Sequence, residues 1–501
     1  MSGIKNLASQ TLWYGVPTIF TRFLSYAIAI LALRYMPLVT NNYNLIYAIL
    51  PFLNVLYVYG LETSYFRFAN TENKQQVYNT LSISLIISSV IFSTLFYFAK
   101  GAIAKTFNID AHPEYITWML AILLLDTLAV LPFCKLREEG RPKKFAAIKV
   151  INIVLNISIV VFFTIVCEHL YASNPNSMWL RFYNPNIKVG YLIIGNLVAS
   201  FVTLLLLYRE LLQIKLKFNV VLWKKIMVYT LPLIIVGFGG MINEMLSRVL
   251  FERFSTLPTT QAKIANSIFA ANFKLAVLVT IFIQIFKMAA EPFFFKKAND
   301  ADAKKTYARV MKFFVIACCF IFMIVAMFTN VWQYLIAYKH KEYAEGIIVV
   351  PILAMGYVFL GIYYNLSVWY KLTNKNNYGA YITIMGVIIT VLLNIILVPL
   401  MGYVGSAIAT FCCYAYMMVI SFIQGQKYYR IPYPYKKLLA FIFITVLLFL
   451  LQRLIYWLLP YNAIYYGFAV LSFWLYTWLI VNVERKELSK IPYLNKFIKA
   501  P

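Results

Sequence analysis

The sequence is divided by short polar segments into fourteen apolar stretches of about twenty residues each. A helix rises 1.5 Å per residue, so about 20 residues cross the roughly 30 Å hydrocarbon core of a bilayer. Strands with open edges would leave backbone groups unpaired in lipid, and each stretch is therefore predicted to be a helix. The predicted spans lie near residues 11–34, 43–66, 77–99, 113–134, 145–167, 189–208, 226–247, 264–287, 310–330, 344–368, 377–398, 402–424, 438–458 and 461–482.

The composition agrees with lipid as the main solvent of the chain. Of 501 residues, 62% are apolar and only 13% are charged. One water-soluble core could not bury that much apolar surface. The sequence therefore predicts an all-α, polytopic integral membrane protein with about fourteen transmembrane helices.

The basic residues predict how the chain is oriented. Lys and Arg outnumber Asp and Glu by 45 to 18, and they gather in short segments between spans, which favours membrane loops and argues against a nucleic-acid partner. The richest segments lie on the same side as the N-terminus, at 137–144, 215–225, 296–312, 427–437 and 485–499. This asymmetry predicts that both termini lie in the cytoplasm.

The two halves of the sequence resemble each other, in the order in which their motifs occur. The matched segments are Tyr14–Pro17 with Tyr229–Pro232, Glu62–Asn70 with Glu291–Asn299, and Leu155–Ile157 with Leu393–Ile395. Two pseudo-symmetric six-helix lobes are predicted, at 1–210 and 211–425, followed by two extra helices and a cytoplasmic tail at 426–501. Repeats of this kind are typical of alternating-access transporters, whose substrate site lies between the repeats.

Charged residues inside spans are the candidate functional residues, because each costs at least about 2.5–3.5 kcal/mol at the centre of a bilayer. Arg22 and Lys274 lie near the middle of spans one and eight. They either pair with a distant carboxylate such as Asp126 or face a water-filled cavity, and the cavity is favoured because two or three cations there would attract a phosphate or pyrophosphate. Glu244 and Arg248 lie one turn apart in span seven, where a self-neutralising pair is an equal alternative.

No enzyme motif is present in the sequence. It contains no GxxxxGK[ST] loop and no HExxH motif, so neither a cofactor, nor a metal site, nor ATP hydrolysis is predicted. His112, His169 and His340 are widely separated and fall in or near outer loops. They are interpreted as solvated loop residues.

The combined pattern resembles the multidrug/oligosaccharidyl-lipid/polysaccharide exporter superfamily, and within it the polysaccharide transporter branch that includes O-antigen flippases. The resemblance covers the whole chain. Its most specific parts are Tyr14–Pro17, Glu62–Asn70 with its echo at Glu291, and Leu393–Thr410, in which an Asn, a Pro and a Gly-x-x-Gly turn precede small residues.

The resemblance implies a two-lobed, V-shaped bundle that carries undecaprenyl-pyrophosphate-linked oligosaccharide across a bacterial inner membrane. Arg22, Lys274 and Arg248 would form a cationic substrate cavity, and Asp126 and Glu244 are the candidates for ion coupling. The expected partners are the lipid-linked oligosaccharide, membrane lipids, glycosyltransferases and a polysaccharide polymerase. Spans thirteen and fourteen are also a feature of the fourteen-helix flippases, whereas twelve-helix multidrug antiporters of the superfamily usually lack them.

Two alternatives remain open from the sequence. A cation-coupled multidrug antiporter would present an acidic or aromatic cavity, against which Arg22 and Lys274 argue. A membrane glycosyltransferase or O-antigen polymerase would generally need long extracytoplasmic loops, and the predicted outer loops are short.

Overall fold

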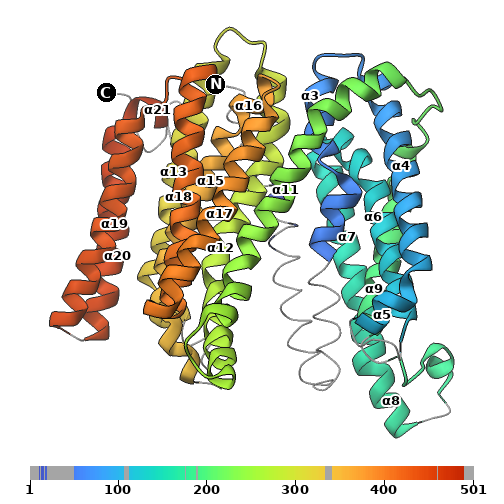
Figure 1. Ribbon diagram of the computed structural model, residues 1–501, viewed down its shortest axis with the longest axis horizontal. Helices are drawn as coiled ribbons and strands as arrows, with labels where there is room; N and C mark the ends of the chain where they lie inside the picture. Colours follow the sequence, from blue (N-terminus) through green and yellow to red (C-terminus); the bar gives the residue numbers. More distant parts are fainter. Residues whose placement is uncertain are drawn as a thin grey trace. The chain divides into compact units, whose positions relative to one another are not determined.

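The computed structural model describes residues 50–106, 112–174, 177–187, 190–332, 341–459 and 461–489, together with isolated positions between 9 and 19. All secondary structure in these residues is helical (Figure 1). Eleven of the described helices are long and apolar enough to cross a membrane. The prediction of an all-α, polytopic membrane protein is confirmed.

The predicted third to fourteenth spans each coincide with a described helix. These helices are α4 (Lys74–Phe98), α6 (Glu114–Glu138), α7 (Pro142–Val161), α9 (Gly190–Leu206), α11 (Val220–Phe254), α12 (Thr259–Lys297), α13 (Ala303–Met327), α15 (Val349–Leu366), α17 (Asn376–Met401), α18 (Tyr403–Tyr428), α19 (Tyr435–Leu458) and α20 (Asn462–Val483). The second predicted span is described from residue 50 onward, and almost all of the first lies outside the described residues.

Shorter helical elements connect or extend these spans. A π-helical turn, η1 (Phe162–Val166), and α8 (Cys167–Ser173) continue α7 without a break. The others are α3 (Leu61–Ala69), α5 (Lys100–Thr106), α10 (Tyr208–Leu211), α16 (Val368–Leu372), α21 (Arg485–Leu488), η2 (Met178–Phe182) and η3 (Lys341–Ile348).

The chain forms two compact units. The N-terminal unit comprises residues 10–238 and 291–296, and the C-terminal unit comprises residues 1–9, 239–290 and 297–501. Helices α11 and α12 are therefore each divided between the two units.

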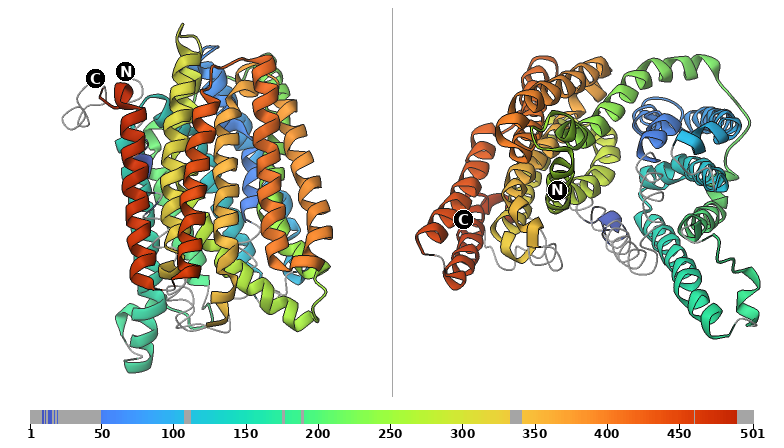
Figure 2. Two further views of the ribbon diagram at one scale, coloured as in Figure 1. Left: turned by 90° about the vertical axis from the view of Figure 1, so that its left-hand side faces the viewer. Right: turned by 60° about the horizontal axis from the view of Figure 1, so that its bottom comes forward.

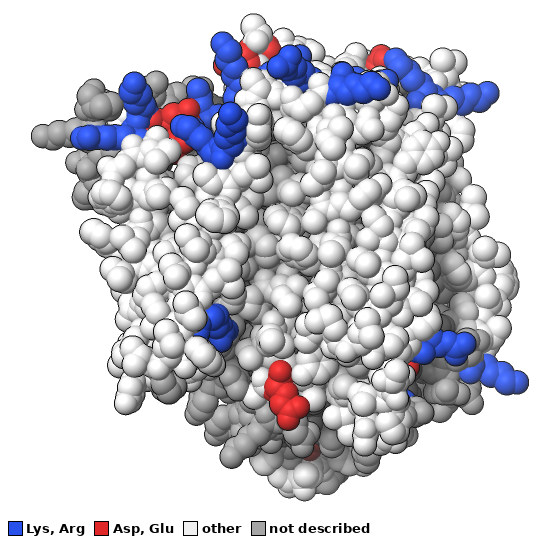
Figure 3. Space-filling model, turned by 60° about the vertical axis from the view of Figure 1, so that its left-hand side comes forward, with Lys and Arg blue, Asp and Glu red and all other residues white. Residues whose placement is uncertain are grey.

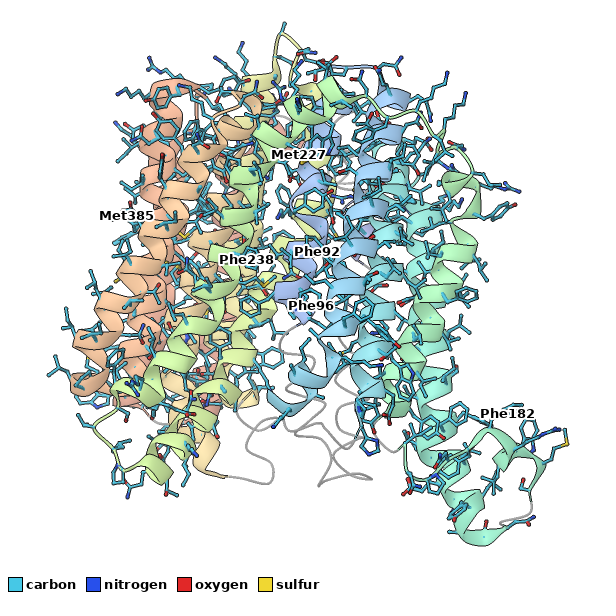
Figure 4. All side chains as sticks on the ribbon, turned by 45° about the vertical axis from the view of Figure 1, so that its right-hand side comes forward. Phe92, Phe96, Phe182, Met227, Phe238 and Met385 are labelled. Carbon is cyan, nitrogen blue, oxygen red and sulfur yellow. The ribbon has the colours of Figure 1, made fainter. Side chains whose placement is uncertain are left out.

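In the N-terminal unit, aromatic side chains of α4 pack on the segment that precedes α3. Phe92 and Phe96 project from the same side of α4 (Figure 4) and pack in one cluster with Tyr57 and Leu120. The rings of Tyr57 and Phe92 lie 5.6 Å apart between centroids. Such ring pairs contribute about 0.5–1.5 kcal/mol beyond the burial of their area.

The second span is interrupted at Gly60, just before α3. Gly60 has φ +77°, a left-handed conformation that side chains with a Cβ disfavour. A Cβ at this position would also lie 3.0 Å from the Cβ of Leu233 in α11. One turn later Ser64 hydrogen-bonds Thr230 across 2.6 Å. The break therefore holds α3 close to the first part of α11, within the N-terminal unit.

In the C-terminal unit, α17 and α18 are joined by a tight turn at Gly402, which has φ +58°. A Cβ on Gly405 would lie 2.4 Å from the carbonyl oxygen of Leu397. The Gly-x-x-Gly motif at this junction thus permits close contact between two helix backbones, in agreement with the general role of small residues in membrane helix packing.

Two asparagines at matching repeat positions make comparable contacts. Asn156 of α7 packs against Gly195 of α9, where an added Cβ would lie 2.8 Å from its side-chain oxygen. Asn394 of α17 accepts a 2.7 Å hydrogen bond from Ser406 of α18. In each unit the asparagine faces a small residue on the next span.

Helices α19 and α20 lie at the periphery of the C-terminal unit, where they appear red in Figure 2. On the face of this unit that Figure 3 shows, Lys and Arg gather mainly along one edge, and a broad, nearly uncharged band lies beside that edge. Ion pairs of this unit join Lys312 to Glu484 and Lys437 to Glu484. An uncharged band beside a basic edge is the surface expected of a membrane-embedded helical unit.

Candidate functional site

Lys274 lies near the middle of α12, in the C-terminal unit, and its side chain is exposed. No described carboxylate forms an ion pair with it. An exposed ammonium at this depth would cost at least about 2.5–3.5 kcal/mol against lipid. The side chain therefore requires water or an anionic ligand.

Further polar side chains lie before and after Lys274 along α12. Ser267, two turns before Lys274 and on the same face, is exposed, as are Gln284 and Lys287 farther along. Lys287 contacts the ring of Tyr364, with its nitrogen 5.0 Å from the ring centroid. The two lysines are thirteen residues apart, which corresponds to about 20 Å along the helix. Thirteen residues also turn the helix by about 140° from alignment, so Lys274 shares a face with Ser267, and Lys287 with Gln284 lies on another side of α12.

Asp126 is the second sequence-predicted residue with a described side chain. It is exposed on α6 of the N-terminal unit, within hydrogen-bonding reach of Ser200 on α9, and it interacts electrostatically with Lys149 on α7. The Lys149 nitrogen lies 4.4 Å from the centroid of the Phe133 ring. This arrangement places an acid and a base that interact electrostatically on two membrane-spanning helices of one unit.

A second charged cluster lies at the end of α6 and joins α3, α6 and the last turns of α12, all in the N-terminal unit. Arg137 donates a 3.1 Å hydrogen bond to Glu62. Thr63 donates a 2.6 Å hydrogen bond to Glu291, whose carboxylate also interacts electrostatically with Arg137. Arg137 additionally stacks over Phe66, 4.7 Å from the ring centroid. Glu62 and Glu291, at equivalent positions of the sequence repeat, thus meet at a single guanidinium.

The sequence places Glu62 near Arg67 and Glu291 near Lys296. In the structure, Glu291 is only 8% exposed, and Glu62 forms an ion pair with Arg137, which is seventy-five residues away in the sequence.

Uncharged polar residues form a buried network in the C-terminal unit. Ser247 of α11 hydrogen-bonds Thr410 of α18 across 2.9 Å, and Asn394 of α17 accepts from Ser406. Thr390 also donates to Asn243 at 3.4 Å. The network links α11, α17 and α18 by neutral hydrogen bonds, which inside a membrane hold helices together.

The remaining predicted site residues have no described side chain. Glu244 and Arg248 lie on the described backbone of α11, and Arg22 lies outside the described residues. Among the described site residues, Lys274 and Asp126 belong to different units.

Four described in-span cations were missed by reasoning from the sequence, namely Lys149, Lys287, Lys312 and Arg453. All four lie within the predicted spans but within about five residues of a span end. At such positions a basic residue is normally assigned to the membrane interface. A search for every charged residue inside a predicted span, regardless of its depth, would have found them.

Comparison with known proteins establishes the fold. No protein-family model matches the sequence, and no curated protein is detectably similar to it. Solved structures do match. One is an outward-facing multidrug resistance MATE family transporter of the MOP superfamily, with a TM-score of 0.68 and 15% identity. A second is a MOP superfamily transporter from Pyrococcus furiosus, with a TM-score of 0.68 and 14% identity, described as having a binding pocket of reverse polarity that suggests a different function.

A third match is the Vibrio cholerae MATE transporter VcmN in its bent form, with a TM-score of 0.64 and 12% identity. Each alignment covers 85% of this chain and 98% of the other. The chain therefore has the fold of the MATE transporters of the MOP superfamily.

Proposed function

We propose that this protein is a flippase that translocates undecaprenyl-pyrophosphate-linked oligosaccharide, the repeat unit of O-antigen or another surface polysaccharide, by alternating access. It would act in the cytoplasmic membrane of a bacterium, with both termini in the cytoplasm. Glycosyltransferases would supply the lipid-linked sugar, and a polymerase would consume it on the opposite side of the membrane.

The observation that carries the proposal is the exposed Lys274 in the middle of α12, with Lys287 as a second exposed lysine farther along the helix. Lys274 and Lys287 are exposed, and neither forms an ion pair with a described carboxylate. A pyrophosphate provides the negative charge that these ammonium groups need, through charge-assisted hydrogen bonds worth about 1.5–3 kcal/mol each. A cationic drug would be repelled by the same charges.

The length of the chain also supports the flippase. The MATE structures are matched over 98% of their own length but over only 85% of this chain, which leaves about 75 of the 501 residues without a counterpart. The segment 426–501, which contains α19 and α20, has about that length. Two additional helices distinguish the fourteen-helix flippases from the twelve-helix antiporters.

Asp126 and Lys149 are the best-described candidates for ion coupling. Protonation of the Asp126 carboxylate would remove the negative charge beside Lys149 and change the charge of the N-terminal unit by one. Proton relays in transporters use carboxylates placed in this way.

The second candidate function is a cation-coupled multidrug antiporter. The names of the matched structures and the exposed carboxylate of Asp126 favour it. In that case Asp126 would serve the transported cation and its coupling ion, and Lys274 would have no part in substrate binding.

Transport assays in proteoliposomes separate the two functions. The assay follows translocation of a fluorescent polyprenyl-pyrophosphate oligosaccharide by the wild type, Lys274→Gln and Lys287→Gln. Lys305→Gln is the matched control, because Lys305 is an exposed lysine of the same unit near the start of α13. Loss of one phosphate contact of about 1.5–3 kcal/mol predicts a transport rate roughly ten- to a hundredfold lower in the two α12 variants.

An unchanged rate in the Lys305→Gln variant completes the expected result. Proton-coupled efflux of cationic dyes, together with no translocation of any lipid-linked sugar by the wild type, would overturn the flippase in favour of the antiporter.

A further inference from the structure

Arg453 is a charged residue within α19, in the C-terminal unit. Its guanidinium donates a 2.6 Å hydrogen bond to the hydroxyl of Thr329, which follows α13 and is fully buried. The rings of Phe449 and Tyr465 lie 5.5 and 5.8 Å from the guanidinium carbon. The Thr329 hydroxyl is itself hydrogen-bonded to the Tyr465 hydroxyl at 3.1 Å. Thr329 after α13, Phe449 of α19 and Tyr465 of α20 thus hold the guanidinium in one orientation.

The charge of Arg453 is not neutralised by the described part of the chain, in which no carboxylate forms an ion pair with it. A guanidinium has five N–H donors, and Thr329 accepts from one of them. The neighbouring Gln452 is fully buried and donates to the carbonyl oxygens of Met327 and Tyr465. Most of the donors of Arg453 therefore remain for another ligand.

The surroundings of Arg453 on α19 face outward. Leu450, one turn before, is 55% exposed, and Trp457, one turn after, is 78% exposed. Since α19 is a membrane-spanning helix at the periphery of its unit, these side chains contact lipid acyl chains or the membrane interface (Figure 2). The guanidinium lies at the border between this surface and the buried Thr329.

The depth of Arg453 matches a lipid headgroup. Lys437, near the basic start of α19, pairs with Glu484 at the charged edge of the unit. Arg453 follows sixteen residues later, about 24 Å farther along the helix. In a hydrocarbon core of about 30 Å, this places the backbone of Arg453 about 6 Å inside the far boundary, from which an arginine side chain can extend to the phosphates of the opposite leaflet.

We propose that Arg453, oriented by Thr329, binds the phosphate of an anionic phospholipid at the surface formed by α13, α19 and α20. Arginine suits this role because its planar fork of donors matches two phosphate oxygens. Leu450 and Trp457 would contact the acyl chain and the glycerol region of the same lipid. The site is independent of the translocated substrate, and its test does not rely on transport.

Native mass spectrometry of the full-length protein in detergent tests the proposal, with phosphatidylglycerol as the probe. The variants are Arg453→Gln, Arg453→Lys and Thr329→Val, with Arg430→Gln as the control. Arg430 is an exposed arginine of the same unit, before the basic start of α19. We expect Arg453→Gln to lower the affinity for the tightest-bound lipid at least tenfold. Arg453→Lys and Thr329→Val should lower it less, and Arg430→Gln should leave it unchanged.

A second measurement identifies the lipid chemistry. Phosphatidylglycerol should compete for binding to the wild type at least fivefold better than phosphatidylcholine. The two lipids should compete equally well for binding to Arg453→Gln. Equal lipid retention by the wild type and a correctly folded Arg453→Gln would overturn the proposal. Binding confined to polyprenyl pyrophosphate would also overturn it, by assigning Arg453 to the substrate instead.

Discussion

Replacement of Arg137 by methionine should destabilise the protein more than loss of any exposed charge. The Arg137 side chain is 4% exposed and lies between Glu62 and Glu291. Methionine retains part of the side-chain volume but leaves two carboxylates without their cation. Removal of one partner from a buried ion pair costs about 3–5 kcal/mol. Because Glu62 is 45% exposed and can be hydrated, most of the cost arises from Glu291, and we expect about 3 kcal/mol.

The assay is thermal unfolding of the purified protein in detergent, followed by tryptophan fluorescence. For a folding unit of about 230 residues, a loss of 3 kcal/mol lowers the unfolding temperature by roughly 6–12 °C. Glu291→Gln should change stability by less than about 1 kcal/mol, because an amide can still accept from Thr63. Combined with Arg137→Met, it should recover about 2 kcal/mol, since the uncompensated buried charge is then gone.

Lys74→Met is the matched control, because it also removes a cation from an ion pair of the N-terminal unit. Lys74 is 60% exposed and pairs with Glu138, so the expected change is below about 1 kcal/mol. The reasoning fails if Arg137→Met unfolds within 2 °C of the wild type, or if Glu291→Gln recovers nothing in the double variant.

Two further predictions concern the C-terminal unit. Gly405→Val should lower stability by about 1–3 kcal/mol, because its Cβ would overlap a backbone carbonyl of α17. Gly467→Val is the control, because Gly467 is a helical position with open space around it. Its unfolding temperature should remain close to that of the wild type in the same assay. Lys312→Met should cost less than the roughly 3–5 kcal/mol of a fully unpaired buried charge, because the nearly buried Glu484 keeps Lys437 as a more distant partner. Glu484→Gln in the same chain should recover most of that loss in denaturant unfolding.

The membrane-spanning helices were predictable because each depends on a local property, a run of apolar residues long enough to cross lipid. For example, α4 starts at Lys74, within three residues of the predicted start near residue 77. The ion pair between Glu62 and Arg137 was not predictable in the same way. Arg137 begins a basic segment that reads as a cytoplasmic loop, and only the packing of α3 against α6 reveals that it is buried.

The candidate site was predictable to a similar extent. Lys274 stands out in the sequence because it is far from both ends of its span. Lys149 and Arg453 are close enough to span ends to resemble interfacial residues, and their neighbours Asp126 and Thr329 lie on other helices. A neighbour on another helix cannot be predicted from the residues next to Lys149 or Arg453 in the sequence.

The peripheral helix α19 is attached at two levels, through Lys437 to Glu484 and through Arg453 to Thr329. One residue inserted between these attachments would turn everything beyond it by about 100° and advance it by 1.5 Å, so that both contacts could no longer form. The number of residues between them is therefore fixed by their partners, Thr329 after the end of α13 and Glu484 after the end of α20. The two attachments thus fix a helix length of about 24 Å, which must match the thickness of the membrane around it.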